Sequence, residues 1–110
     1  MTTKYAPRGL GNQGRKLWDS VMDEFDMNEA DQVILEEACR VRDLVVELGK
    51  QIERYGIMAS SSQGVRVHPA VSEVRQQRLV LARLLATLDI PAPDEDALPA
   101  SSGVRSLRAV

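Results

Sequence analysis

The fold of this 110-residue chain is decided by residues 28–56, NEADQVILEEACRVRDLVVELGKQIERYG. Asn28 is a residue type that caps helix N-termini, and the acids Glu29 and Asp31 follow it, where carboxylates favour the positive end of a helix dipole. No proline interrupts the stretch before Gly56, which suits a left-handed helix cap. The stretch therefore predicts one helix of about 27 residues, about 40 Å long.

Apolar side chains recur along this predicted helix at heptad spacing. The seam consists of Ile34, Ala38, Val41, Val45, Leu48, Ile52 and Tyr55. Such spacing is typical of helices that pack along their whole length. The seam can be used inside one monomer, but a helix of this length exceeds what a 110-residue globule needs. We therefore expect part of the seam to meet a second subunit.

Two further helices and a hairpin are predicted around this element. An apolar stripe that includes Trp18 predicts a short helix from Gly14 to Phe25. Two short extended runs within residues 57–67 flank a polar turn, which predicts a small β-hairpin. A second long helix is expected from Pro69 to about Leu88. The predicted fold is mainly α: a short N-terminal helix plus two long antiparallel helices joined by a small β-hairpin.

The composition predicts three parts of the chain. Residues 1–13 contain proline and glycine and read as a flexible basic arm. Residues 14–90 read as one helical domain. Residues 91–110 are rich in proline, acidic residues and serine, and read as a disordered tail, because they bury too little apolar surface to repay ordering.

The charge is distributed unevenly. The formal net charge of −2 excludes a uniformly basic coat for nucleic acid, so any DNA affinity must come from a local patch. Residues 1–18 hold four basic side chains and no acid, whereas residues 19–37 hold eight acids and no base. The acidic block is typical of a solvated helix surface. The candidate DNA-binding residues are Arg8, Arg15 and Lys16, with Arg66 in the hairpin as a further candidate.

The sequence offers few groups for catalysis. His68 precedes a proline, where a turn or cap role is the usual one, and Cys39 is the lone cysteine. Neither a metal-ligand spacing nor a Gly-rich phosphate loop occurs. No run of about 18 apolar residues and no signal sequence is present. We therefore expect no enzyme, no metal, no cofactor and no membrane segment.

An ordered set of features resembles a known family. These features are Gly11 and Gly14 ahead of Leu17-Trp18, the helix start at Asn28, Leu35, Cys39, Asp43, Gly56, Gly64, His68-Pro69, and Leu88 with Ile90-Pro91. Over about residues 8–92 the chain is similar to the small subunit of tailed-bacteriophage terminases, in the compact family whose two long helices flank a hairpin. It departs from that pattern at Asp89, where glycine is expected.

The resemblance implies a non-catalytic DNA-packaging component of the host bacterial cytoplasm. Such a subunit assembles into a ring, binds double-stranded viral DNA and regulates the large terminase subunit, which carries the ATPase and nuclease. On this basis residues 14–90 would be the oligomerisation and DNA-engaging domain. We expect the oligomer interface to comprise Ile34, Val41, Val45, Leu48, Ile52, Leu81 and Leu85. Two other readings stay open: a helix-turn-helix DNA-binding regulator, and a helical scaffold or adaptor without DNA binding.

Overall fold

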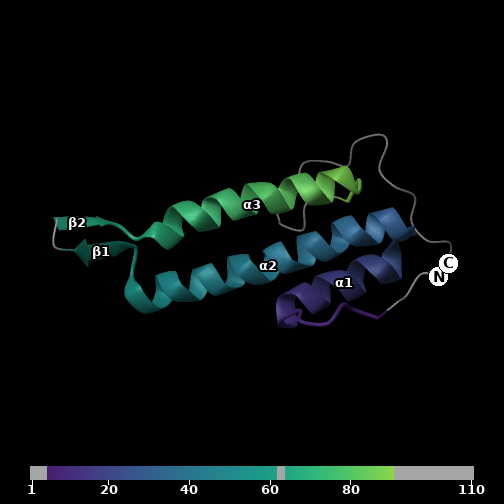
Figure 1. The fold of residues 1–110 in the computed structure, drawn as a ribbon, viewed down its shortest axis with the longest axis horizontal. Helices are drawn as coiled ribbons and strands as arrows, with labels where there is room; N and C mark the ends of the chain where they lie inside the picture. Colours follow the sequence, from purple (N-terminus) through teal and green to yellow (C-terminus); the bar gives the residue numbers. More distant parts are fainter. Residues whose placement is uncertain (1–4, 62–63, 91–110) are drawn as a thin grey trace.

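The computed structural model describes residues 5–61 and 64–90, and within them the chain is mainly helical. The elements are α1 (Asn12–Glu24), α2 (Glu29–Tyr55), β1 (Met58–Ser61), β2 (Gly64–Val67) and α3 (Pro69–Thr87) (Figure 1). The predicted mainly α fold is confirmed. The predicted tail, residues 91–110, and the first four residues of the predicted arm lie outside the described residues.

Helix α2 begins and ends where its sequence predicts. The Asn28 side chain accepts a hydrogen bond from the Asp31 N–H at 2.8 Å, and the Asp31 carboxylate accepts one from the Asn28 N–H at 3.2 Å. This reciprocal pair is a capping box that satisfies two N–H groups at the helix start. At the other end Gly56 adopts φ +81°, and its N–H donates to the Ile52 carbonyl. The helix spans 27 residues, the length predicted.

Helix α3 is capped by its flanking residues. Pro69 occupies its first position, and the His68 Nδ1 accepts the Ala70 N–H at 3.0 Å. The helix ends at Thr87, and Asp89 adopts φ +58° beyond it. The family resemblance predicts glycine at this position. Aspartate is one of the residue types that tolerate a left-handed backbone, so Asp89 can take its place.

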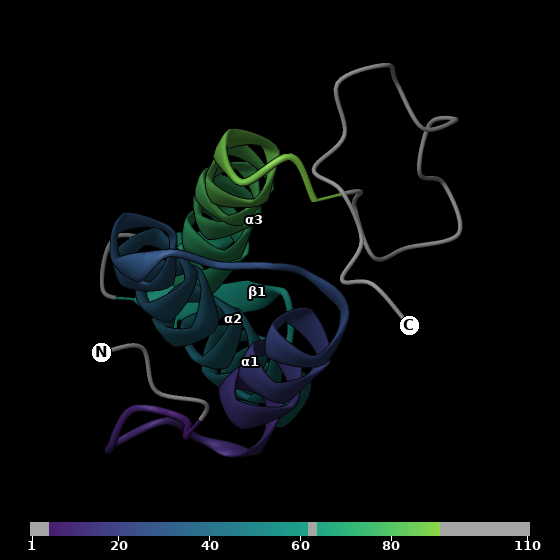
Figure 2. The same ribbon diagram turned by 90° about the vertical axis from the view of Figure 1, so that its right-hand side faces the viewer.

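Helix α2 lies at the centre of the packing, with α1 on one side and α3 on another (Figure 2). The α1 side is built around Trp18, Leu35 and Cys39, which are 2 % exposed or less, together with Leu88 from beyond α3. Since α2 packs against both other helices, it places every other described element of the fold.

The heptad seam of α2 faces α3 of the same chain. Val45 and Leu48 form one cluster with Ala70 and Val74, and Ala38 forms another with α3 residues about two to four turns further along that helix. The expected interface residues Val45, Leu48, Leu81 and Leu85 are all buried in these clusters, and Ile34, Val41 and Ile52 are half-buried against core clusters. The four buried side chains hold α2 and α3 of one chain together. A role of this seam in an oligomer stays a prediction.

The two strands pair antiparallel at the far end of the long helices from α1 (Figure 1). Cα partners are Met58 with Val67, Ala59 with Arg66, Ser60 with Val65, and Ser61 with Gly64. Partnered and alternate residues share a face, so Met58, Val65 and Val67 lie on one face and Arg66 on the other. The strand β2 is exposed along its length. None of the helices in the described ranges combines the length and hydropathy needed to span a membrane.

Candidate nucleic-acid interface

The N-terminus of α1 is capped by a carboxylate from α2. The Asp43 Oδ2 accepts the Gly11 N–H at 2.6 Å, and its Oδ1 accepts the Gly14 N–H at 2.8 Å. Gly11 has no side chain that could cap the helix itself, so Asp43 satisfies N–H groups that the helix geometry leaves without partners. Its negative charge also lies at the positive end of the α1 dipole. Asp43 is therefore the residue that fixes where α1 begins on α2.

Close helix packing explains the two glycines of the sequence motif. A Cβ on Gly14 would lie 2.7 Å from the Cys39 carbonyl oxygen, and a Cβ on Gly11 would lie 2.9 Å from the Asp43 Oδ1. A side chain at position 14 would therefore force the α2 backbone away, and one at position 11 would displace the capping carboxylate of Asp43. The glycines and Asp43 thus form one docking point between α1 and α2, and α1 begins at Asn12, two residues before the predicted start.

The segment before α1 is folded against the same point. Leu10 is 6 % exposed and belongs to the core cluster between α1 and α2. The Leu10 carbonyl accepts from the Arg15 Nη2 at 3.3 Å, and the Arg8 carbonyl accepts from the Arg40 Nη2 at 3.3 Å. Buried apolar contact and side-chain hydrogen bonds thus join this segment to α1 and α2, and the flexible basic arm over residues 1–13 stays a prediction.

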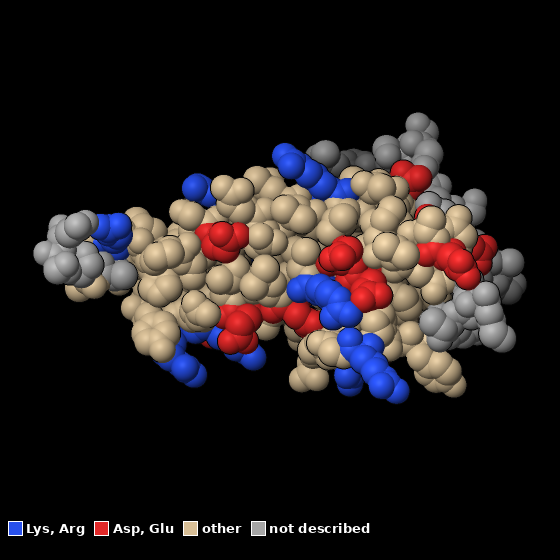
Figure 3. All heavy atoms as spheres, in the orientation of Figure 1, with Lys and Arg blue, Asp and Glu red and all other residues tan. Residues whose placement is uncertain are grey.

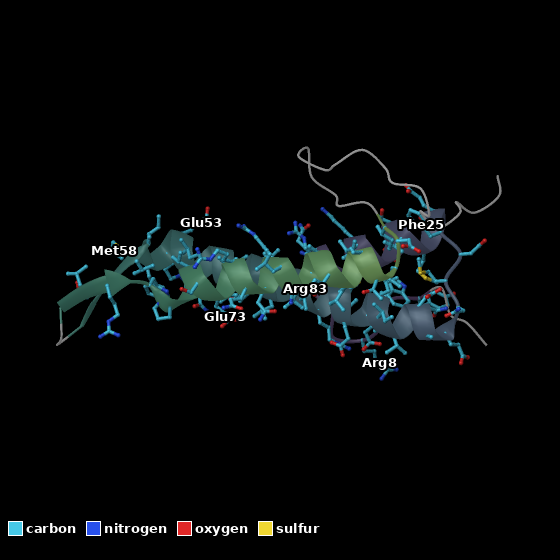
Figure 4. All side chains as sticks on the ribbon, turned by 90° about the horizontal axis from the view of Figure 1, so that it is seen from above. Arg8, Phe25, Glu53, Met58, Glu73 and Arg83 are labelled. Carbon is cyan, nitrogen blue, oxygen red and sulfur yellow. The ribbon has the colours of Figure 1, made fainter. Side chains whose placement is uncertain are left out.

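This packing gathers cationic side chains from three places in the sequence. Arg8, Arg15 and Lys16 are exposed, as predicted for residues that would reach phosphate, and Arg40 of α2 joins them through the Arg8 carbonyl. We call these four residues the α1 cationic surface. Arg8 points away from the helical body in Figure 4. Sequence reasoning missed Arg40, because it follows the acidic block and only the fold brings it to Arg8.

Arg40 is also paired with an acid. Its Nη2 lies 2.6 Å from the Glu36 Oε2, one turn earlier on α2. This pair is exposed on both sides, so its contribution to the free energy of folding is about 0.5 kcal/mol or less. Its effect is positional: Glu36 orients the guanidinium that holds the Arg8 backbone.

The fourth predicted DNA residue lies elsewhere. Arg66 is on β2, and the hairpin lies at the opposite end of the long axis from α1 in a molecule with extents of 57 × 32 × 20 Å. Arg8, Arg15 and Lys16 thus lie on α1 or just before it, and Arg66 lies at the other end of the molecule. Acidic side chains bound the cationic surface: Asp19, Asp23, Glu24 and Asp26 are exposed on the rest of α1 and just after it.

The remaining reactive groups have structural surroundings. Burial, with the negative charges of Asp43 and Glu36 adding to it, raises the pKa of the Cys39 thiol to about 12. His68 uses its Nδ1 to cap α3 and stacks on Tyr55, with ring centroids 6.1 Å apart. In residues 5–61 and 64–90 no three His, Cys, Asp or Glu side chains gather as a metal site would require.

Comparison with known proteins bears on what the α1 cationic surface is for. Residues 14–96 match the family model described as phage terminase, small subunit. No curated protein and no solved structure matches the chain. The matched residues include all of α2 and α3, α1 from Gly14 onward, and Asp43, the partner of Gly14, and they extend over more than half of the chain. The chain therefore belongs to the family of phage terminase small subunits, the family that its sequence motifs resemble.

Proposed function

We propose that this protein acts in phage DNA packaging as a non-catalytic, ring-forming subunit that binds double-stranded viral DNA and regulates the large terminase subunit. Membership of the terminase small-subunit family supports the packaging role. The observation that carries the DNA-binding part is the α1 cationic surface: Arg15 and Lys16 are exposed on the docked helix α1, and Arg8 is exposed in the segment that precedes it.

The chemistry of these side chains fits phosphate. Guanidinium groups form paired, charge-assisted hydrogen bonds with phosphate oxygens, and an ammonium group supplies a mobile point charge. Contacts of this kind position a protein on DNA without reading bases. The surface therefore favours binding that is weakly dependent on sequence and strongly dependent on salt.

One subunit has too few cations for tight binding, and its acids oppose a wider footprint. Several copies in one assembly would present the α1 cationic surface repeatedly, so weak phosphate contacts would add through multivalency. This is the physical reason to join DNA binding to self-association. A helix-turn-helix regulator is less well supported, because acids surround the α1 to α2 connection, where such a protein would face phosphate.

We propose that residues 91–110 contact the large terminase subunit. We also propose that the protein acts in the host bacterial cytoplasm. The prolines and acids of residues 91–110 set them apart from the helical part of the chain. A binding segment separate from the DNA surface would let one subunit engage both partners. Truncation after Ile90 is expected to weaken stimulation of the large-subunit ATPase and leave helicity unchanged.

DNA binding is tested by removing the charges. The variant Arg8→Ala/Arg15→Ala/Lys16→Ala is expected to bind duplex DNA more weakly at every sequence, and the slope of log affinity against log salt is expected to fall by about 0.9 for each lost phosphate contact. Circular dichroism checks that the helices persist. The matched control is Lys50→Ala/Arg54→Ala, which removes cations from the other end of α2. An unchanged affinity and slope in the triple variant would move the DNA site elsewhere, with Arg66 tested next.

A further inference from the structure

A second heptad pattern runs along α2 on a side that neither α1 nor α3 covers. Its members, spaced 4, 3, 4, 3 and 4 residues apart, are all exposed: Val33, Glu37, Arg40, Leu44, Glu47 and Gln51. We call them the α2 outer face. Val33 is 65 % exposed and Leu44 is 41 % exposed, although both are apolar. Glu37 and Glu47 flank Leu44 and have no ion-pair partner within the described residues. Arg40 of this face is paired with Glu36, so the face presents two exposed apolar side chains and two unpaired acids.

Helix α3 carries a complementary pattern. Ser72, Arg75, Leu79, Ala82 and Ala86 are spaced 3, 4, 3 and 4 residues apart and are all exposed, with exposed Arg83 beside them. We call these six residues the α3 outer face. It lies on the side of α3 opposite the buried Val74, Leu81 and Leu85, and it contains no acid. Figure 3 shows blue spheres along the upper margin of the molecule, where α3 lies, with a red group at its right, and red and blue spheres side by side lower down.

We propose that the α2 outer face of one copy packs against the α3 outer face of the next copy. This inference rests on the proposed homo-oligomer and names its interface. The two faces differ, so the contact is heterologous, and repeating a heterologous contact forms a ring when the rotation between copies closes. The buried seam thus holds α2 and α3 together as a helical hairpin within one chain. The two outer faces then join the helical hairpin of one copy to that of the next.

Charge and apolar content both favour a second copy as the occupant. The α3 outer face presents Arg75 and Arg83 around Leu79, and the α2 outer face presents Glu37 and Glu47 around Leu44. A phosphate backbone would pair with the arginines but would leave Leu79, which is 56 % exposed, against a charged strand. A protein surface with acids around a leucine covers all three side chains. Ala82 and Ala86 have short side chains, which allow the two helices to approach closely.

The heights of these residues along the hairpin also agree. Within one chain, Ala38 packs with Leu81 and Leu85, while Val45 and Leu48 pack with Ala70 and Val74. If the symmetry axis is parallel to the long helices, neighbouring copies are related by a rotation without a shift along the axis. Residues at the same height along α2 and α3 then face each other in neighbouring copies. Glu37 then lies at the level of Arg83, and Glu47 lies within about one helical turn of Arg75. A single rotation between neighbouring copies would therefore form two ion pairs around a contact between Leu44 and Leu79.

Charge reversal tests this pairing. One variant is Glu37→Arg/Glu47→Arg, and the other is Arg75→Glu/Arg83→Glu. Each is expected to shift the native mass of the full-length protein toward monomer and to raise the concentration needed for assembly about tenfold or more, because two attractive contacts become repulsive. The four side chains are exposed and make no ion pair within the described residues, so circular dichroism and the melting temperature should stay close to those of the wild type.

The decisive step is recovery. A 1:1 mixture of the two variants, and a single chain carrying all four substitutions, both restore opposite charges across the contact, so both are expected to regain assembly. Asp19→Arg/Asp23→Arg is the matched control, since it changes the charge equally on α1 and should assemble like the wild type.

Three results would overturn the inference. The first is wild-type assembly by each charge-reversed variant alone. The second is loss of assembly without recovery in either the mixture or the fourfold variant, which would mean that the two faces do not meet each other. The third is wild-type mass with weakened DNA binding in Arg75→Glu/Arg83→Glu, which would make the α3 outer face a DNA surface. A wild-type protein that stays monomeric would instead refute the proposed homo-oligomer itself.

Discussion

Asp43→Ala is expected to release α1 from α2 while leaving the α2 to α3 hairpin in place. The substitution removes a carboxylate that accepts two N–H groups, from Gly11 at 2.6 Å and from Gly14 at 2.8 Å. The Gly14 N–H is part-buried and points into the helix contact, so water replaces its lost partner poorly. The Gly11 N–H is exposed, and water replaces that bond readily.

The magnitude follows from these two bonds. A hydrogen bond to a charged group contributes about 1.5–3 kcal/mol when its donor is shielded, and loss of a helix cap costs about 0.5–2 kcal/mol. We therefore expect Asp43→Ala to lower the free energy of unfolding by about 3 kcal/mol, most of it from Gly14. With a urea dependence of about 1.5 kcal/mol/M, the midpoint falls by about 2 M. Asp43→Asn keeps one acceptor oxygen and is expected to lose about half as much.

Urea unfolding followed by circular dichroism measures the loss, and amide hydrogen exchange localises it. The Gly14 N–H should exchange much faster in Asp43→Ala, whereas amides in the middle of α3 should keep their protection relative to global unfolding. Asp19→Ala removes an exposed carboxylate from α1 and should change the free energy of unfolding by no more than about 0.5 kcal/mol. Equal effects of Asp43→Ala and Asp19→Ala would refute the capping role.

Two further predictions concern the buried core. Val45 is 3 % exposed in the cluster between α2 and α3, so Val45→Asp buries a charge there and should lower the free energy of unfolding by about 3 kcal/mol or more. Val45→Ala should lower it by about 2 kcal/mol or less. A wild-type urea midpoint for Val45→Asp would contradict the packing. Cys39, with its pKa raised to about 12, should resist iodoacetamide at pH 8 in the native protein and react once unfolded in urea. The pKa of Cys39 in the folded protein lies above the ordinary value of 9.0, so the neutral thiol favours folding below pH 9. Its contribution to the free energy of unfolding should be lost between pH 9 and about 12. Cys39→Ser should lack this pH dependence.

Local signals in the sequence predict the helices well. The Asn28 cap, the Gly56 end and the Pro69 start each act through their own neighbours within four residues, so a single sequence suffices to place them. The α1 start was predicted two residues late because its cap is not local: Gly11 carries no capping side chain, and Asp43 is 32 residues away. A cap supplied by another helix leaves no pattern at the helix that it caps.

The use of the apolar seam is where sequence reasoning was less reliable. Heptad spacing shows that α2 packs along its length, but it does not distinguish a helix of the same chain from a helix of another. The structure resolves this for Val45 and Leu48, which pack on α3. The candidate DNA residues Arg8, Arg15 and Lys16 were found from local charge, whereas Arg40 required the fold, because its contact with the Arg8 carbonyl joins residues that are 32 positions apart.

The length of α2 is explained by the number of surfaces it serves. Through Cys39 and Asp43 it positions α1 and the segment that carries Arg8; through Val45 and its neighbours it binds α3. Its remaining side carries Glu37 and Leu44 toward a proposed second copy. This third side carries two exposed apolar side chains, Val33 and Leu44, among charged and polar ones. Arg40 lies where the first and third of these surfaces meet, so a subunit contact at the α2 outer face would press on the residue that holds Arg8, and assembly and DNA binding would share one side chain.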